Sequence, residues 1–86
     1  MKRFEDLVFS ELPDGFGVQS RIVFENGYGA SVVKGPYTYG GKMGLYELAV
    51  LDSDGEITYA TSITSDVVGY LRPEDVTDAM QRIQKL

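Results

Sequence analysis

Two short turn signals, Asn26-Gly27 and Asp54-Gly55, constrain the fold of this chain more than any other feature. Each lies between runs in which apolar and other residues alternate, and Asn, Asp and Gly readily adopt the positive φ angles of tight hairpin turns. Residues 18–64 are therefore predicted to form two β-hairpins that turn at these positions. A glycine- and tyrosine-rich connector, residues 35–44, joins the two hairpins.

The alternation in the first hairpin also predicts its register. A three-residue loop of residues 26–28 pairs Phe24 with Ala30 and keeps the apolar side chains of both strands on one face. A two-residue loop shifts the pairing by one residue and sends those side chains to opposite faces. We therefore predict the three-residue loop, which leaves Tyr28 partly exposed at its tip.

The second hairpin favours a two-residue loop at Asp54-Gly55, because this loop pairs Val50 with Tyr59 across the strands. Cross-strand pairs of aromatic and β-branched residues stabilise a sheet, so Tyr46 and Tyr59 are predicted to face the core. The opposite face needs a cover, either the N-terminal segment or a second copy of the chain in a homodimer. Its three apolar side chains are Leu45, Ala49 and Leu51.

A C-terminal helix is predicted for residues 72–86. Pro73 fits the first helical position, where an amide hydrogen would have no partner within the helix. The fold class is therefore α+β: an antiparallel sheet of about four strands, in two hairpins, with the helix packed on one face. The apolar residues that form the helical stripe against the sheet are Val76, Ala79, Met80, Ile83 and Leu86.

The remaining segments are short, and residues 1–86 have room for a single domain. In residues 1–17 we expect a turn at Leu12-Pro13-Asp14-Gly15 and a short element that covers the sheet edge. Residues 64–71 are expected to connect the last strand to the helix, through a short helical turn capped by Ser65 or Asp66.

The composition argues against several classes of protein. The chain has no cysteine and no histidine, so it lacks the usual nucleophile–base pairs and the commonest metal ligands. A net charge of −5 disfavours nucleic-acid binding, which normally requires a basic surface. No segment approaches the ~20 apolar residues of a membrane span, and no signal peptide is apparent. We predict a cytoplasmic protein that has no catalytic residues, metal or cofactor and binds neither nucleic acid nor membrane.

Two short patterns resemble ligand-binding motifs but lack essential residues. Gly40-Gly41-Lys42 is followed by Met43, whereas a phosphate-binding loop needs Ser or Thr there and a helix after it. The acidic cluster in residues 52–56 lacks the first and last carboxylates of a calcium loop. Glu47, on a presumed central strand, is the one carboxylate whose position suits a hydrolase, and a strand-edge charge is its simpler interpretation.

Loop tyrosines are the best candidates for a binding surface, because tyrosine brings a large contact area at a low entropic cost. Tyr37 and Tyr39 lie in the glycine-rich connector with Lys42 nearby, and Tyr28 lies in the first hairpin. These four residues are the predicted binding residues. They suit either a protein partner or a small molecule or nucleotide held by the loop from Gly35 to Gly44. The alternative is a crossover loop that uses glycine only for its unusual φ angles.

Three segments resemble a family of small bacteriophage and prophage proteins. They read ENGYGASVV (residues 25–33), GLYELAVL (residues 44–51) and ITSDVVGYL (residues 63–71). The family has no assigned function, so the resemblance carries over no site residues. It implies a phage-encoded accessory protein in the bacterial cytoplasm that binds and modulates a host protein, for example one that acts in defence.

Overall fold

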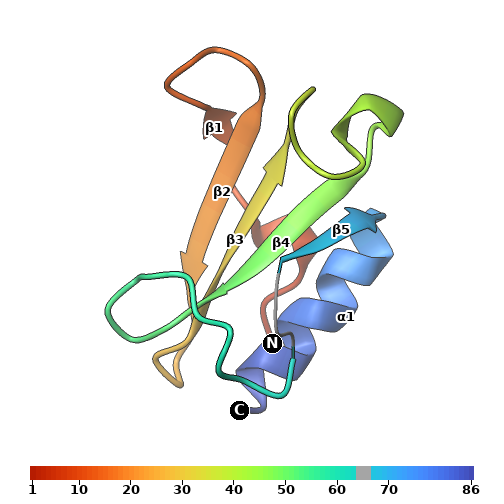
Figure 1. The fold of residues 1–86 in the computed structure, drawn as a ribbon. Helices are drawn as coiled ribbons and strands as arrows, with labels where there is room; N and C mark the ends of the chain where they lie inside the picture. The colour runs from red at the N-terminus through yellow and green to blue at the C-terminus, as the bar shows by residue number, and fades with distance from the viewer. Residues whose placement is uncertain (64–66) are drawn as a thin grey trace.

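The computed structural model describes residues 1–63 and 67–86 (Figure 1). An antiparallel sheet of five strands, ordered as in the chain, lies in front of the C-terminal helix in this view. The α+β class and the helix on one face are confirmed, but the sheet has five strands rather than about four. The described elements are the 3₁₀ turns η1 (Phe4–Asp6) and η2 (Gly41–Met43), the strands β1 (Ser10–Glu11), β2 (Val18–Val23), β3 (Gly29–Lys34), β4 (Tyr46–Leu51) and β5 (Val68–Leu71), and the helix α1 (Pro73–Gln84).

The first hairpin has a three-residue loop, but this loop begins one residue earlier than predicted. The amide of Phe24 donates to the carbonyl of Tyr28 (2.8 Å), so the loop consists of residues 25–27. Gly27 then supplies the positive φ (+91°) that the third position of such a loop requires. The predicted pairing of Phe24 with Ala30 is wrong by two residues, and a shift of two keeps every side chain on its face. Tyr28 closes the loop and is half-buried against the core, rather than lying at the loop tip.

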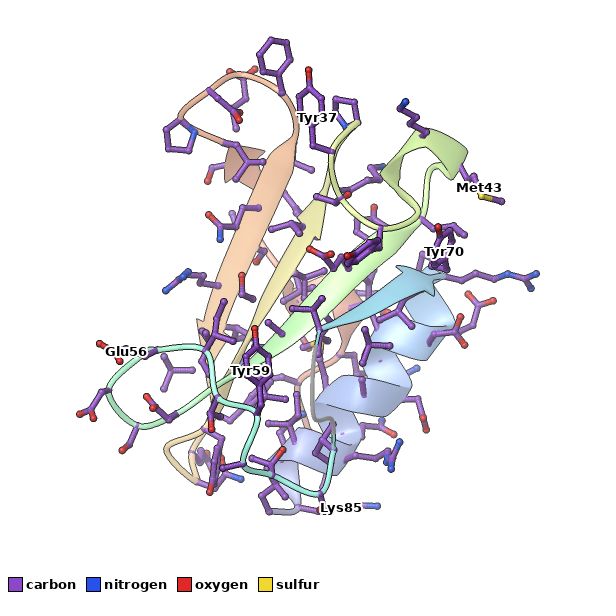
Figure 2. All side chains as sticks on the ribbon, in the orientation of Figure 1. Tyr37, Met43, Glu56, Tyr59, Tyr70 and Lys85 are labelled. Atoms are coloured by element: carbon purple, nitrogen blue, oxygen red, sulfur yellow. The ribbon has the colours of Figure 1, made fainter. Side chains whose placement is uncertain are left out.

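The second turn is present, but its outgoing arm does not form the predicted strand. The amide of Asp52 donates to the carbonyl of Glu56 (2.8 Å) and Gly55 has a φ of +78°, so this loop also has three residues rather than two. The chain leaves the sheet after Thr58, and β5 pairs with β4 instead. The pairing predicted for Tyr59 is therefore wrong, and this side chain is half-exposed on the face turned to the viewer in Figure 2.

Strand β5 replaces that arm because it is more apolar. Val68 lies opposite Leu48, whereas the predicted register pairs Leu48 with Thr61. Burial of apolar surface favours the valine, since it removes more such surface from water than the threonine does. Part of the predicted connector is thus a strand, and the helical turn predicted with a cap at Ser65 or Asp66 lies outside the described residues.

Helix α1 begins at the predicted proline. The carboxylate of Asp75 accepts a hydrogen bond from the amide of Arg72 (3.0 Å), and its charge suits the positive end of the helix dipole. No helix in the described ranges is long and apolar enough to cross a membrane. Leu86 lies beyond the end of the helix and is exposed, contrary to the predicted stripe. The stripe otherwise packs as predicted on the sheet, with Val76, Met80 and Ile83 fully buried.

The N-terminal segment covers the sheet edge and part of its helix side. Strand β1 pairs with the outer edge of β2, as the predicted covering element should. The rings of Phe4 and Phe9 lie 5.1 and 5.6 Å from that of Tyr46, measured between centroids. Tyr46 therefore faces the core side of the sheet, as predicted.

The sheet face opposite α1 is covered by the chain itself. Residues 52–63 pass in front of this face in Figure 1. The amide of Thr58 donates to the carbonyl of Val50 (2.9 Å), and Ile57 forms a bridge with Leu51. Ala49 and Leu51 are buried as a result. The apolar area from which the sequence predicts a homodimer is thus largely covered within one chain, and the homodimer stays a prediction without that support.

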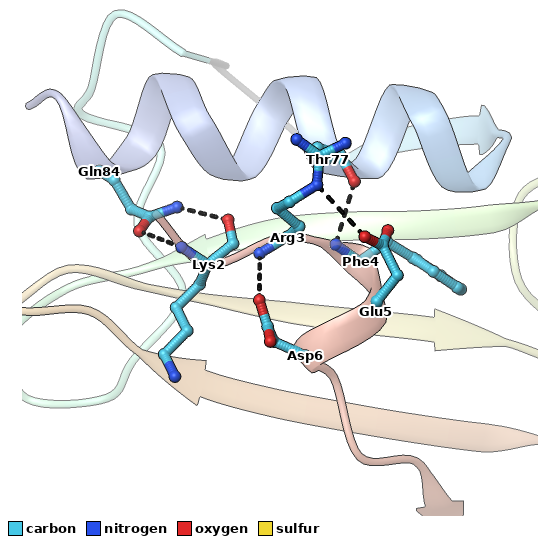
Figure 3. Close-up of polar contacts among 7 residues, drawn as sticks. All are labelled: Lys2, Arg3, Phe4, Glu5, Asp6, Thr77 and Gln84. Carbon is cyan, nitrogen blue, oxygen red and sulfur yellow. Dashed lines mark hydrogen bonds and ion pairs between the residues drawn. The ribbon is translucent and has the colours of Figure 1, made fainter.

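Hydrogen bonds hold the N-terminus against α1 (Figure 3). The amide of Phe4 donates to Oγ1 of Thr77 (3.0 Å), whose side chain is buried. The side-chain amide of Gln84 both accepts from the backbone of Lys2 (2.9 Å) and donates to it (2.8 Å). These contacts join the two ends of the described chain across the helix side of the sheet.

Replacing Thr77 with valine is expected to lower the free energy of unfolding by about 1–3 kcal/mol, because the Phe4 amide loses its acceptor while the shape is kept. Urea denaturation followed by circular dichroism measures this difference. Thr77→Ser keeps the hydroxyl and is the matched control, which should retain most of the stability. A valine variant as stable as the wild type would show that this bond contributes nothing.

Candidate functional site

Hydrogen bonds fix the backbone of the connector, residues 35–44. Oγ1 of Thr38 accepts from the amide of Gly35 (3.0 Å) and donates to its carbonyl (2.9 Å). The amide of Gly41 donates to the carbonyl of Thr38 (3.1 Å), and that of Leu45 to the carbonyl of Gly40 (3.0 Å). The connector is therefore a compact loop that is bonded to itself.

Glycines let this loop pack directly on neighbouring backbone. A Cβ atom on Gly41 would overlap the carbonyl oxygen of Gly35, and one on Gly35 would overlap that of Phe16. Gly40 has a φ of +89°, and a Cβ there would lie 2.9 Å from the Cα of Tyr70. The glycines thus serve both unusual φ angles and close packing, and they join the connector to the loop before β2 and to β5.

Five large side chains project from this end of the sheet, and we call this set the aromatic end. Figure 2 shows Tyr37, Met43 and Tyr70 on it. The rings of Phe16 and Tyr37 meet edge to face with centroids 5.7 Å apart. Exposed apolar side chains that gather in this way typically mark an interaction surface. The exposed fractions are 53% for Phe16, 80% for Tyr37, 61% for Tyr39, 71% for Met43 and 59% for Tyr70.

Tyr70 occupies a conformation that bulky residues normally avoid. Its φ is +59°, which makes it the only non-glycine residue with positive φ in the described chain. Such a conformation costs roughly 1–2 kcal/mol and persists only where the surroundings impose it. Here the amide of Tyr70 donates to the carbonyl of Tyr39 (3.1 Å), and a Cβ on Gly69 would overlap that of Tyr39. The fold therefore maintains local strain and still exposes the Tyr70 ring.

A small hollow is lined by Tyr39, Tyr70, Lys42 and Met43, among other residues. Its volume is ≈ 190 Å³, whereas sites for drug-sized molecules usually measure about 300–1,000 Å³. Lys42 is exposed in η2 and brings a positive charge to this hollow. The hollow suits one side chain of a partner better than a whole nucleotide.

The structure brings together three of the four predicted binding residues. Tyr37, Tyr39 and Lys42 all lie at the aromatic end. Tyr28 lies at the opposite end of β3, next to the loop where the side chain of Asn26 donates to the carbonyl of Ile83 in α1 (2.9 Å). Tyr28 therefore does not belong to the same surface.

Three members of the aromatic end were absent from the predicted set: Phe16, Met43 and Tyr70. Phe16 stands between two glycines in a turn, and a large apolar residue in such a place is a usable signal. Met43 lies within the connector, so it could also have been predicted to be exposed. Tyr70 reaches this surface through the pairing of β5 with β4, which local sequence does not encode.

The acidic residues considered for chemistry lie in other surroundings. Glu47 is partly buried on the face opposite α1, where Oε1 accepts a long hydrogen bond from the Tyr39 amide (3.4 Å). Oδ1 of Asp52 accepts from the amides of Asp54 (2.9 Å) and Glu56 (3.0 Å) and so stabilises its own turn. Among the described residues, no group of three or more acidic side chains is placed to hold a metal ion.

Comparison of the chain with protein-family models, with curated proteins and with solved structures found no match.

Proposed function

We propose that this is a non-enzymatic protein that binds another protein through the aromatic end. One observation carries the proposal: the packed connector, the turn before β2 and strand β5 together present five large, exposed side chains at one end of the sheet. Tyrosine, phenylalanine and methionine are enriched at the centres of protein interfaces. A rigid backbone also lowers the entropic cost of association, because little has to be ordered on binding.

The expected partner follows from the family resemblance. Small phage proteins of the kind that this chain resembles are made in the bacterial cytoplasm, and many act on host proteins. A bacterial host protein, for example a component of a defence system, is therefore the proposed target. The exposed Lys42 beside the hollow favours an acidic residue next to an apolar one on that target.

Mutation of the aromatic end tests this proposal. Tagged wild-type protein, expressed in bacteria and captured, should retain a specific partner, and Tyr37→Ser with Tyr39→Ser should weaken that association by about thirtyfold or more. Tyr59→Ser is the matched control, because Tyr59 is also an exposed tyrosine but lies in the segment after β4. Loss of the partner with the double variant and its retention with the control supports the proposal. Equal retention in all three proteins contradicts it.

A small molecule or nucleotide held by the loop from Gly35 to Gly44 is the second candidate. The observation that favours it is the chemistry of the residues around the hollow: the rings of Tyr39 and Tyr70 can stack on a base, and Lys42 can pair with a phosphate. A ligand that binds only the folded state must raise the melting temperature, so a thermal-shift screen with nucleotides at millimolar concentration is decisive. A rise that Lys42→Ala abolishes would favour this candidate, and an unchanged melting temperature would eliminate it.

A further inference from the structure

The outer edge of β2 is paired at only two of its six residues. Strand β1 lies opposite Val18 and Gln19, and the chain before Ser10 then leaves the edge. The amide of Phe24 donates to the carbonyl of Tyr28, the residue before β3. Since alternate residues of an antiparallel strand bond to the same neighbour, Ile22 and Ser20 also turn their N–H and C=O groups toward β3. Arg21 and Val23 consequently direct their N–H and C=O groups outward, where no described strand pairs with them.

A hollow lies directly beside this unpaired part of the edge. Its volume is ≈ 530 Å³, and Val23, Phe24, Lys2 and Asp6 are among its lining residues. The Val23 side chain is 71% exposed, which is unusual for valine in a regular strand. Backbone groups in strand register, an exposed β-branched side chain and an adjacent open space together form an acceptor for an extended peptide.

Arg21 adds charge to the same edge. It is exposed, and Nη1 donates to the carbonyl of Gly55 (3.1 Å). Within the described chain it makes no ion pair with a carboxylate. An acidic side chain directly across from Arg21 on an added strand would therefore find an available cation.

We infer that the outer edge of β2 at Arg21 and Val23 accepts an extended segment of another protein as an added antiparallel strand. The segment carries an apolar β-branched residue opposite Val23 and an acidic residue opposite Arg21. In the antiparallel direction these two residues are separated by one, and the apolar one comes first. The side chain between them points to the helix side of the sheet, toward the hollow.

The register argues against a second copy of this chain as the added strand. Pairing of two β2 edges through their outward groups places Arg21 opposite Arg21, Val23 or Glu25 of the second copy, depending on the register. In these three registers residue 23, 25 or 27 of the second copy falls opposite Gln19, where Ser10 already lies. The register that brings Glu25 to Arg21 also requires an extended Glu25, whereas residues 25–27 form the tight hairpin loop. A separate extended segment meets no such obstacle, because it can end before Gln19.

The other edge of the sheet is a poorer acceptor. Tyr70 in β5 has a positive φ, and its amide is already bonded to the connector. The pairing of β5 with β4 is also irregular between Tyr46 and Leu48. Irregular edge strands of this kind resist the addition of further strands, so β2 is the edge open to pairing.

A synthetic peptide tests the inference directly. The probe is acetyl-Thr-Val-Thr-Glu-Thr-amide, titrated into ¹⁵N-labelled protein while the amide resonances are recorded. The Arg21 and Val23 amides should shift and exchange more slowly with solvent. N-methylation of the peptide Val and Glu, which removes the two donors that face β2, should weaken binding about tenfold or more. N-methylation of the first two Thr residues is the matched control and should preserve binding.

Two protein variants complete the test. Val23→Pro removes one outward N–H at an edge position where proline is tolerated, so the peptide should no longer shift the Arg21 amide resonance. Val23→Thr keeps this N–H and should still show the shift. Arg21→Glu should reverse the charge that the edge prefers in the facing side chain, so a peptide with Lys in place of Glu should bind this variant more tightly than the original peptide does.

The inference is overturned if the Arg21 and Val23 amides do not shift at ~10 mM peptide, where even weak millimolar binding would show. Equal binding of the two methylated peptides would overturn it as well. The double variant Tyr37→Ser and Tyr39→Ser should bind the peptide normally, so this test is independent of the aromatic end.

Discussion

Gly41→Ala is expected to lower the free energy of unfolding by about 3 kcal/mol or more, because forced overpacking against fixed atoms is among the costlier substitutions. The added Cβ would overlap the carbonyl oxygen of Gly35, which is backbone and cannot rotate away as a side chain can. Relief requires the connector to move as a unit. The position of Tyr37 and Tyr39 should change with it, so the variant should also lose partner binding.

Gly44→Ala is the matched control for this prediction. Gly44 lies in the same connector with a φ of +76°, but nothing lies within 4 Å of a Cβ placed there. Its substitution should therefore cost only the roughly 1–2 kcal/mol of a left-handed backbone conformation. Urea denaturation of the two variants measures the difference. Equal costs at both positions would show that the connector is not closely packed on Gly35.

Leu48→Ala is expected to destabilise the protein by about 2–5 kcal/mol, the range for removing a fully buried leucine side chain. Leu48 has no exposed surface and lies between Val32 of β3 and Val68 of β5 in the sheet. A domain of this size has a total stability of only about 5–15 kcal/mol. The variant should therefore unfold at a much lower denaturant concentration.

The same substitution at Leu86 is the control. Leu86 is partly exposed beyond the end of α1, so Leu86→Ala should change the stability by less than about 0.5 kcal/mol. Both variants need the same dependence of free energy on urea concentration for the comparison to hold. A Leu48 variant as stable as the Leu86 variant would contradict the assignment of the core to this side of the sheet.

Local sequence predicted those parts of the fold that depend on neighbouring residues. The turn at Gly27 and the proline that opens α1 are examples, since each signal acts within a few residues. The loop at Gly27 began one residue early because the glycine with positive φ must take the third loop position. The second turn also has its glycine, Gly55, at the third position of a three-residue loop, where two residues were predicted. The chain then leaves the sheet after Thr58, so Tyr59 does not have the predicted core position.

Local signals could not predict which strands pair when they lie far apart in the chain. Strand β5 has only four residues and contains Gly69, so its sequence is a weak strand signal. Its pairing with β4 brings Tyr70 to the connector, and the turn before β2 brings Phe16 there. The connector tyrosines were predictable as exposed loop residues. That Phe16 and Tyr70 lie beside them was not predictable, because the three segments meet only in the folded sheet.

The strand order has a consequence for how this protein folds. Every strand pairs with its neighbour in the chain, so the sheet can form through a series of local contacts, and chains dominated by local contacts fold quickly. The hydrogen bonds between Lys2 and Gln84 close a separation of 82 residues, and such contacts carry a larger loop-closure cost. We therefore expect β2, β3 and β4 to assemble first. The docking of the two chain ends against each other would then be the last step, and the first to open.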